Sequence, residues 1–104
     1  MIMVNTDTIP GKSIKSSLGL VRGNTIRARH IGKDIIAGLR GIVGGEIVEY
    51  TKLIAEAREQ AIDRMLVDAK TLNADAVINV RFTTSVIMGG AAELLAYGTA
   101  VKLG

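Results

Sequence analysis

The histidine at position 30 is the first candidate for chemistry, because it is the only histidine in the chain. Asp34 follows it by four residues, and on a helix this spacing would place the imidazole and the carboxylate on one face, where both could bind a metal ion. Metal sites usually need three or four ligands, however, and the chain has no cysteine to supply a thiolate. We keep His30 and Asp34 as candidate metal ligands and favour a surface or interface histidine. No cofactor is predicted.

Three carboxylates form a second candidate: Glu56, Glu59 and Asp63. Clustered carboxylates can bind a cation or share a proton. Basic residues are interspersed with them, namely Lys52, Arg58 and Arg64. Such alternation is typical of a solvated helix surface, which is the interpretation we favour.

The glycine-rich segment from Gly38 to Gly45 precedes a helical stretch, which is where a phosphate-binding loop would lie. It lacks the Lys-Ser/Thr pair and the Gly-x-Gly-x-x-Gly spacing of the known loops. Glu46 and Glu49 would also repel an anion at this helix start. We therefore favour close packing or a hinge.

Basic residues are concentrated in the first half of the chain, where seven Lys and Arg residues oppose two Asp residues through Gly45. The densest group contains Arg27, Arg29 and Lys33, which we keep as candidates for binding an anionic ligand. Nucleic acid is a disfavoured partner, because a sheet that binds it usually offers aromatic side chains for stacking and none lies near this group. A solvated surface, or charges that complement a neighbouring subunit, is the favoured interpretation.

A long helix from Glu46 to Leu72 must organise these groups, since the stretch contains neither Gly nor Pro. Its apolar residues recur every three or four positions: Ile47, Tyr50, Ile54, Ala57, Ala61, Met65, Ala69 and Leu72. A helix of 27 residues is about 40 Å long. A compact domain of this size has a radius of gyration of about 13 Å and is therefore only about 30 Å across. The helix must therefore lie along long strands, or overhang them and meet another subunit. Asn73 is the predicted left-handed stop.

The remaining segments predict strands and one short helix around a single domain of residues 1–104. The expected strands are Ile2–Val4, Ser13–Arg22 with a continuation through Thr25–Arg29, Asp75–Val86 and Ala92–Leu103, and the short helix is Ile31–Val43. In the strand that begins at Ser13, alternation places Ile14, Leu18 and Leu20 on one face. In the strand that begins at Asp75, it places Ile78, Val80 and Phe82 on one face. The predicted fold is α+β, with a mostly antiparallel sheet packed against the long helix and the short helix in two layers.

Both faces of the last strand are apolar or small, and one helix can cover only one of them. This excess of apolar surface predicts self-association. The predicted subunit contacts are small residues: Gly38, Gly41, Ala96, Gly98 and Ala100.

We expect no membrane span, because no run approaches about 18 uncharged apolar residues. The first residues lack the basic segment with which a signal peptide begins, so we do not expect one. The lack of cysteine is consistent with the predicted cytoplasmic location.

An ordered set of motifs resembles the YbjQ-like family of small bacterial and archaeal proteins along nearly the whole chain. The motifs are Ile9-Pro-Gly-Lys12, Leu18-Gly-Leu-Val-Arg-Gly23, the segment Ala37–Gly45, Ala74-Asp-Ala-Val77 and Tyr97-Gly-Thr-Ala-Val101. Asn73 stands where the family commonly has Gly, and both residues accept a left-handed backbone. The resemblance implies a dodecin-like subunit, a ring-shaped homo-oligomer with a pentamer as the implied number, and a heavy-metal-binding label without an established activity.

The leading hypothesis is therefore a non-enzymatic cytoplasmic protein that forms a homo-oligomeric ring. The alternative is a binder of metal ions or small ligands, with sites assembled between subunits, because symmetry can multiply one His30 into several ligands. An enzyme is disfavoured, since the chain shows no nucleophile elbow and its single histidine leaves few possible triads.

Overall fold

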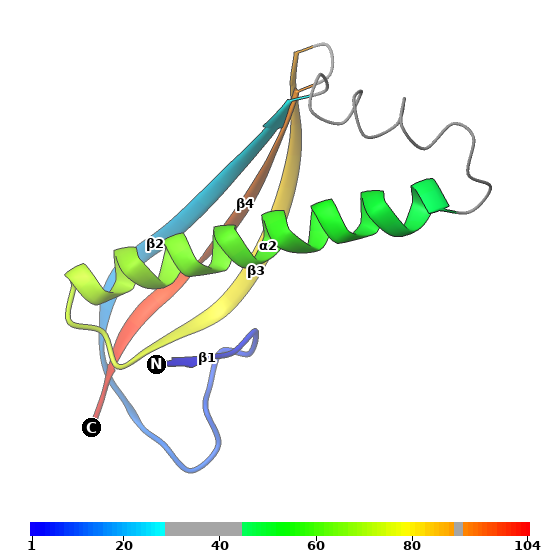
Figure 1. The fold of residues 1–104 in the computed structure, drawn as a ribbon. Coiled ribbons are helices and arrows are strands. Elements are labelled where there is room, and N and C mark those ends of the chain that lie inside the picture. The colour runs from blue at the N-terminus through cyan, green and yellow to red at the C-terminus, as the bar shows by residue number, and fades with distance from the viewer. Residues whose placement is uncertain (29–44, 89–90) are drawn as a thin grey trace.

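A single long helix packs on a four-stranded sheet in the computed structural model, which describes residues 1–28, 45–88 and 91–104 (Figure 1). The elements are β1 (Ile2–Met3), β2 (Ile14–Ala28), α2 (Gly45–Thr71), β3 (Ala76–Met88) and β4 (Ala91–Leu103). The predicted α+β class, the long helix and all four strands are confirmed. The predicted short helix, Ile31–Val43, lies outside the described residues.

The sheet has the strand order β1-β3-β4-β2, with β4 antiparallel to both of its neighbours. β1 pairs parallel to β3 through Ile2 opposite Ala76 and Met3 opposite Val77. The sheet is therefore mixed, where the sequence predicted a mostly antiparallel one. A parallel pair needs a long connection, and the chain between β1 and β3 supplies it with β2 and α2.

Helix α2 buries a narrow stripe of mostly small side chains, at Ala57, Ala61, Met65 and Ala69. These residues are spaced by four and lie on the predicted apolar face, and their small size allows the helix to approach the sheet closely. The helix ends as predicted: Asn73 has a φ of 57°, and the Ala74 N–H donates to the Ala69 carbonyl over 3.2 Å. This arrangement satisfies the last carbonyls of the helix.

The main core lies between α2 and the sheet. Met65 and the helical alanines pack there against Val21 of β2, Val77 and Val80 of β3, and Ala96 and Ala100 of β4. A smaller cluster lies on the opposite face at one end of the sheet, where Ile9 of the N-terminal segment packs with Ala76, Ile78 and Val101. The N-terminal segment is held there by backbone bonds, including the Val80 N–H to the Val4 carbonyl over 3.1 Å.

Four register shifts interrupt the strand pairing, and two of them change which of the predicted side chains face the core. The register shifts between Ser17 and Gly19 in β2, and between Ile78 and Arg81 in β3. Each bulge inserts one extra residue and so reverses the alternation beyond it. The predicted face of Leu18 with Leu20 is therefore wrong, because Leu18 packs against the main core while Leu20 is 63% exposed.

The same correction applies to β3. Val80 belongs to the main core, whereas Ile78 belongs to the cluster on the opposite face, so the predicted common face of Ile78, Val80 and Phe82 is wrong. Asn79 lies between them with a φ of 54°, in the left-handed region that accommodates the extra residue. In β4, Ala96 and Ala100 face the main core and Val101 faces away, so both faces of this strand carry apolar or small side chains, as predicted.

The structure is elongated for its size. The radius of gyration of its Cα atoms is 17.1 Å, with extents of 56 × 26 × 17 Å, compared with about 13 Å for a compact chain of this length. Figure 1 shows the N-terminal end of α2 projecting past the strands. Within the described ranges, no helix has both the length and the apolar character needed to cross a bilayer.

Candidate functional site

A row of three polar side chains crosses the face of the sheet opposite α2. Arg22 of β2 and Arg81 of β3 both lie in register with Tyr97 of the central strand β4. Residues directly opposite each other in a sheet have Cβ atoms about 5 Å apart, so the three side chains are neighbours. We call Arg22, Tyr97 and Arg81 the arginine–tyrosine row.

The charges of this row are not neutralised within the described part of the chain. The guanidinium of Arg22 is exposed and has no hydrogen bond or ion pair with any described residue. Arg81 donates from Nη1 to the carbonyl oxygens of Asn5, over 2.7 Å, and Val80, over 3.0 Å. These bonds orient Arg81 but leave its positive charge, so the row presents two cations beside a partly buried tyrosine.

Apolar side chains surround the row on the same face. Leu20 is 63% exposed and Ile26 is 54% exposed, both on β2, and Leu95 lies partly buried beside them on β4. We call the arginine–tyrosine row together with Leu20, Ile26 and Leu95 the open sheet face. Arg and Tyr next to apolar residues are typical of surfaces that bind other proteins.

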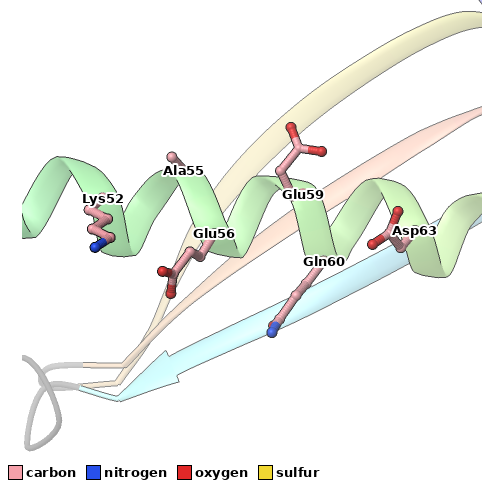
Figure 2. A pocket seen from close by; sticks show the side chains of 6 residues that line it. All are labelled: Lys52, Ala55, Glu56, Glu59, Gln60 and Asp63. Carbon is pink, nitrogen blue, oxygen red and sulfur yellow. The ribbon is translucent and has the colours of Figure 1, made fainter.

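An open hollow of about 470 Å³ lies along the middle of α2. Its lining residues, which Figure 2 labels, are Lys52, Ala55, Glu56, Glu59, Gln60 and Asp63, and we call it the acidic hollow. Three carboxylates oppose one ammonium group there. None of these carboxylates has an ion pair or hydrogen bond with another described residue, so the hollow carries a negative charge.

The acidic hollow is not a preformed metal centre. Figure 2 shows the carboxylate of Glu56 on one side of the helix and that of Glu59 on the other. In residues 1–28, 45–88 and 91–104 no three His, Asp or Glu side chains are grouped so that they could hold a metal ion. The predicted metal ligands His30 and Asp34 lie outside these ranges, as do Arg29 and Lys33, and their roles stay predictions.

The other predicted site residues fall in three places. Gly38 and Gly41 lie outside the described residues. Arg27 is opposite Ala92 in the β2–β4 ladder, and only its backbone is described. The small residues of β4 are buried inside the chain: Ala96, Gly98 and Ala100.

These small residues have a clear role within one subunit. Ala96 and Ala100 lie under α2 in the main core. A Cβ atom on Gly98 would lie 2.7 Å from Cγ1 of Val77, so a larger residue would not fit beside β3. Their predicted contact with a second copy stays a prediction.

Sequence reasoning missed the arginine–tyrosine row, because its members are distant in the chain and only the strand register brings them together. One signal was present. The Gly-Gly pair at positions 89 and 90 is a turn signal in the sequence, and a tight turn there would pair residues whose numbers sum to about 179, which would place Arg81 within one position of Tyr97. The bulges that set the final register left a weaker signal, namely Gly19 and Asn79, two residue types that accept a backbone with positive φ.

Comparison with known proteins gives a consistent family assignment. A family model, YbjQ, described as "Putative heavy-metal-binding", matches residues 1–104. A "UPF0145 protein" of Methanosarcina acetivorans is 62% identical over 103 residues, which cover 99% of this chain and 97% of that protein. Another of Archaeoglobus fulgidus is 60% identical, over 99% of this chain and 95% of that protein. A third, of Psychromonas ingrahamii, is 55% identical, over 99% and 98%.

A solved structure supports the fold. A crystal structure of a protein of unknown function in the DUF74 family, from Pediococcus pentosaceus, matches with a TM-score of 0.66 at 16% identity. The match covers 100% of this chain and 98% of that one. At this identity the likeness supports the fold alone.

Proposed function

Because this chain belongs to the YbjQ-like family, whose model matches its full length, we propose that it works as a non-enzymatic homo-oligomer. The subunit is a two-layer, dodecin-like unit, and the copies form a closed ring of five in the cytoplasm. The non-enzymatic part is supported by the sequence, which has no cysteine and one histidine and so few nucleophile–base pairs.

The open sheet face is the observation that carries this proposal. α2 covers one face of the sheet, and the N-terminal segment covers only one end of the other. Leu20 and Ile26 remain more than half exposed there, beside Leu95 and Tyr97. Covering an exposed apolar side chain of this size contributes about 1.5–3 kcal/mol, so a second copy on this face would be stabilised.

The shape of the chain supports the same conclusion. Its accessible surface is 6773 Å², whereas a compact monomer of 11.0 kDa exposes about 5600 Å² by surface scaling. A chain with this much surface gains more from association than a compact one, and identical contacts repeated by a rotation that closes form a ring.

Size-exclusion chromatography with light scattering tests the oligomer directly. Five copies of the 11.0 kDa chain have a mass of about 55 kDa, which is the expected value at micromolar concentration. An 11.0 kDa species throughout the concentration range would contradict the proposal.

A second function, binding of metal ions or small ligands between subunits, is favoured by the family description. In a ring, each His30 and each carboxylate occurs once per copy, so neighbouring copies could complete a coordination shell that one chain lacks. Titration calorimetry with zinc, copper and nickel tests it. We expect heat and a fixed metal-to-ring ratio for the wild type, and loss of the heat in His30→Ala. If none of the three ions gives a heat of binding, the proposed metal-binding function is contradicted.

A further inference from the structure

We propose that the open sheet face of one subunit docks on the acidic hollow of α2 in the next copy of this chain. This inference rests on the proposed homo-oligomer and specifies its interface. It is heterologous, because two different surfaces meet and every copy uses both.

Charge complementarity is the first argument. The arginine–tyrosine row carries two guanidinium groups, and the acidic hollow carries three carboxylates against one ammonium group. Within the described residues, neither the Arg22 guanidinium nor any of these carboxylates has a partner of opposite charge. The carboxylate of Asp68 accepts a hydrogen bond from the backbone N–H of Arg22 over 3.1 Å, which leaves the guanidinium unpaired. Bringing the two surfaces together would pair charges that one chain leaves unpaired, which favours and orients association.

The spacing of the charges also matches. Arg22 and Arg81 lie two strands apart, which is about 9.5 Å at about 4.8 Å per strand. Glu56 and Asp63 are seven residues apart on α2, which is about 10.5 Å at about 1.5 Å per residue. With the helix laid along the row so that Arg22 faces Glu56 and Arg81 faces Asp63, each arginine can reach one end carboxylate and Tyr97 faces the middle of the hollow.

Apolar side chains extend the match beyond the charges. Val67 is 60% exposed and lies one helical turn beyond Asp63, on the side of α2 that faces away from the sheet of its own subunit. Leu20 and Ile26 flank the arginine–tyrosine row. An interface centred on Arg and Tyr with apolar neighbours has the composition of a stable contact.

A two-fold contact between two open sheet faces would instead bring the arginine–tyrosine rows of both copies together. Glu93 is a carboxylate on that face, and it already accepts a hydrogen bond from Asn24 over 3.0 Å. With the two-fold axis passing through the row, the arginines of each copy would face those of the other, which is unfavourable. Docking on the helix avoids this repulsion, and a heterologous contact repeated around an axis closes into a ring.

Charge reversal tests the interface in the full chain. The sheet variant is Arg22→Glu, and the helix variant is Glu56→Lys with Glu59→Lys. Each alone should raise the subunit concentration needed for half assembly by about 30-fold or more, because every interface in the ring then opposes like charges. Combining the two variants in one chain should restore much of the assembly.

Lys12→Glu is the matched control for the sheet variant, since it makes the same charge change as Arg22→Glu in an exposed turn outside both surfaces. Circular dichroism shows whether each variant keeps its fold. Assembly that survives both single variants, that responds to only one of them, or that the combined variant fails to restore would overturn this interface while leaving the homo-oligomer in place. A monomeric wild type would instead remove the proposed function itself.

Discussion

Gly23 lies directly against the backbone of Met65, so that a Cβ atom on Gly23 would lie 2.2 Å from the Met65 nitrogen and 2.3 Å from the Ala61 carbonyl oxygen. Strand β2 and helix α2 therefore touch through their backbones at this point. Since β2 also carries Arg22 on its other face, this contact fixes the distance between the arginine–tyrosine row and the helix of the same subunit.

Replacing Gly23 with alanine should destabilise the fold strongly. The added methyl group meets backbone atoms that cannot rotate away, and overpacking of this kind costs about 1–3 kcal/mol. We expect a loss of about 3 kcal/mol in the free energy of unfolding, measured by urea denaturation at fixed protein concentration. Ser17→Ala on the exposed part of β2 is the control, and a Gly23→Ala protein as stable as this control would contradict the close contact.

The buried hydroxyl of Thr25 should contribute to the same packing. Its Oγ1 donates to the carbonyl oxygen of Ala57 over 3.1 Å, and the side chain is 1% exposed. Thr25→Val keeps the shape but removes the donor, so we expect a loss of about 1 kcal/mol in thermal or urea unfolding. Thr84→Val makes the same change on an exposed strand position, and an equal effect of both substitutions would show that the hydrogen bond adds nothing.

The left-handed backbone at Asn79 should select which residues are tolerated there. Its φ of 54° is easy for glycine, accepted by asparagine and costly for β-branched residues. Asn79→Gly should leave the free energy of unfolding nearly unchanged, whereas Asn79→Val should lower it by about 1–2 kcal/mol. If Asn79→Val has the same free energy of unfolding as Asn79→Gly, the left-handed backbone at the bulge between Ile78 and Val80 is contradicted.

Salt should weaken the proposed assembly, because its interface pairs the arginines of one copy with the carboxylates of the next. Raising NaCl to about 1 M shortens the screening length to about 3 Å. We expect the subunit concentration for half assembly to rise by about tenfold, measured by light scattering across a dilution series. An assembly that tightens in salt would point to a purely apolar contact instead.

Much of the fold could be predicted because its signals are local. The absence of Gly and Pro from position 46 to position 72, with apolar residues every three or four positions, indicates the helix before any partner is known. Asn73 marks its end, because few residues other than glycine adopt a left-handed backbone as readily. The alternation of β4 is also local. Because both of its faces are apolar or small, the sequence indicates that one helix leaves one face of this strand uncovered.

The bulges were not predictable in the same way. An extra residue in a strand is stabilised by the partner strand and by the packing on both faces, so nothing in the residues around Gly19 or Asn79 compels it. The consequence is large, because each bulge sends the following side chains to the other face. Leu20 thereby becomes exposed and Val21 buried.

The sequence by itself determined the composition of the surfaces: a basic first half, an acidic set on one long helix, and more apolar side chains than one helix can cover. Only the tertiary structure decided which of these groups stand together. Strand register places Arg22 and Arg81 on either side of Tyr97, and packing of α2 through Gly23 hides Ala96 and Ala100 inside the subunit. The physical reason is that residue type and spacing act over a few positions, whereas register and close backbone contact are settled between segments distant in the chain.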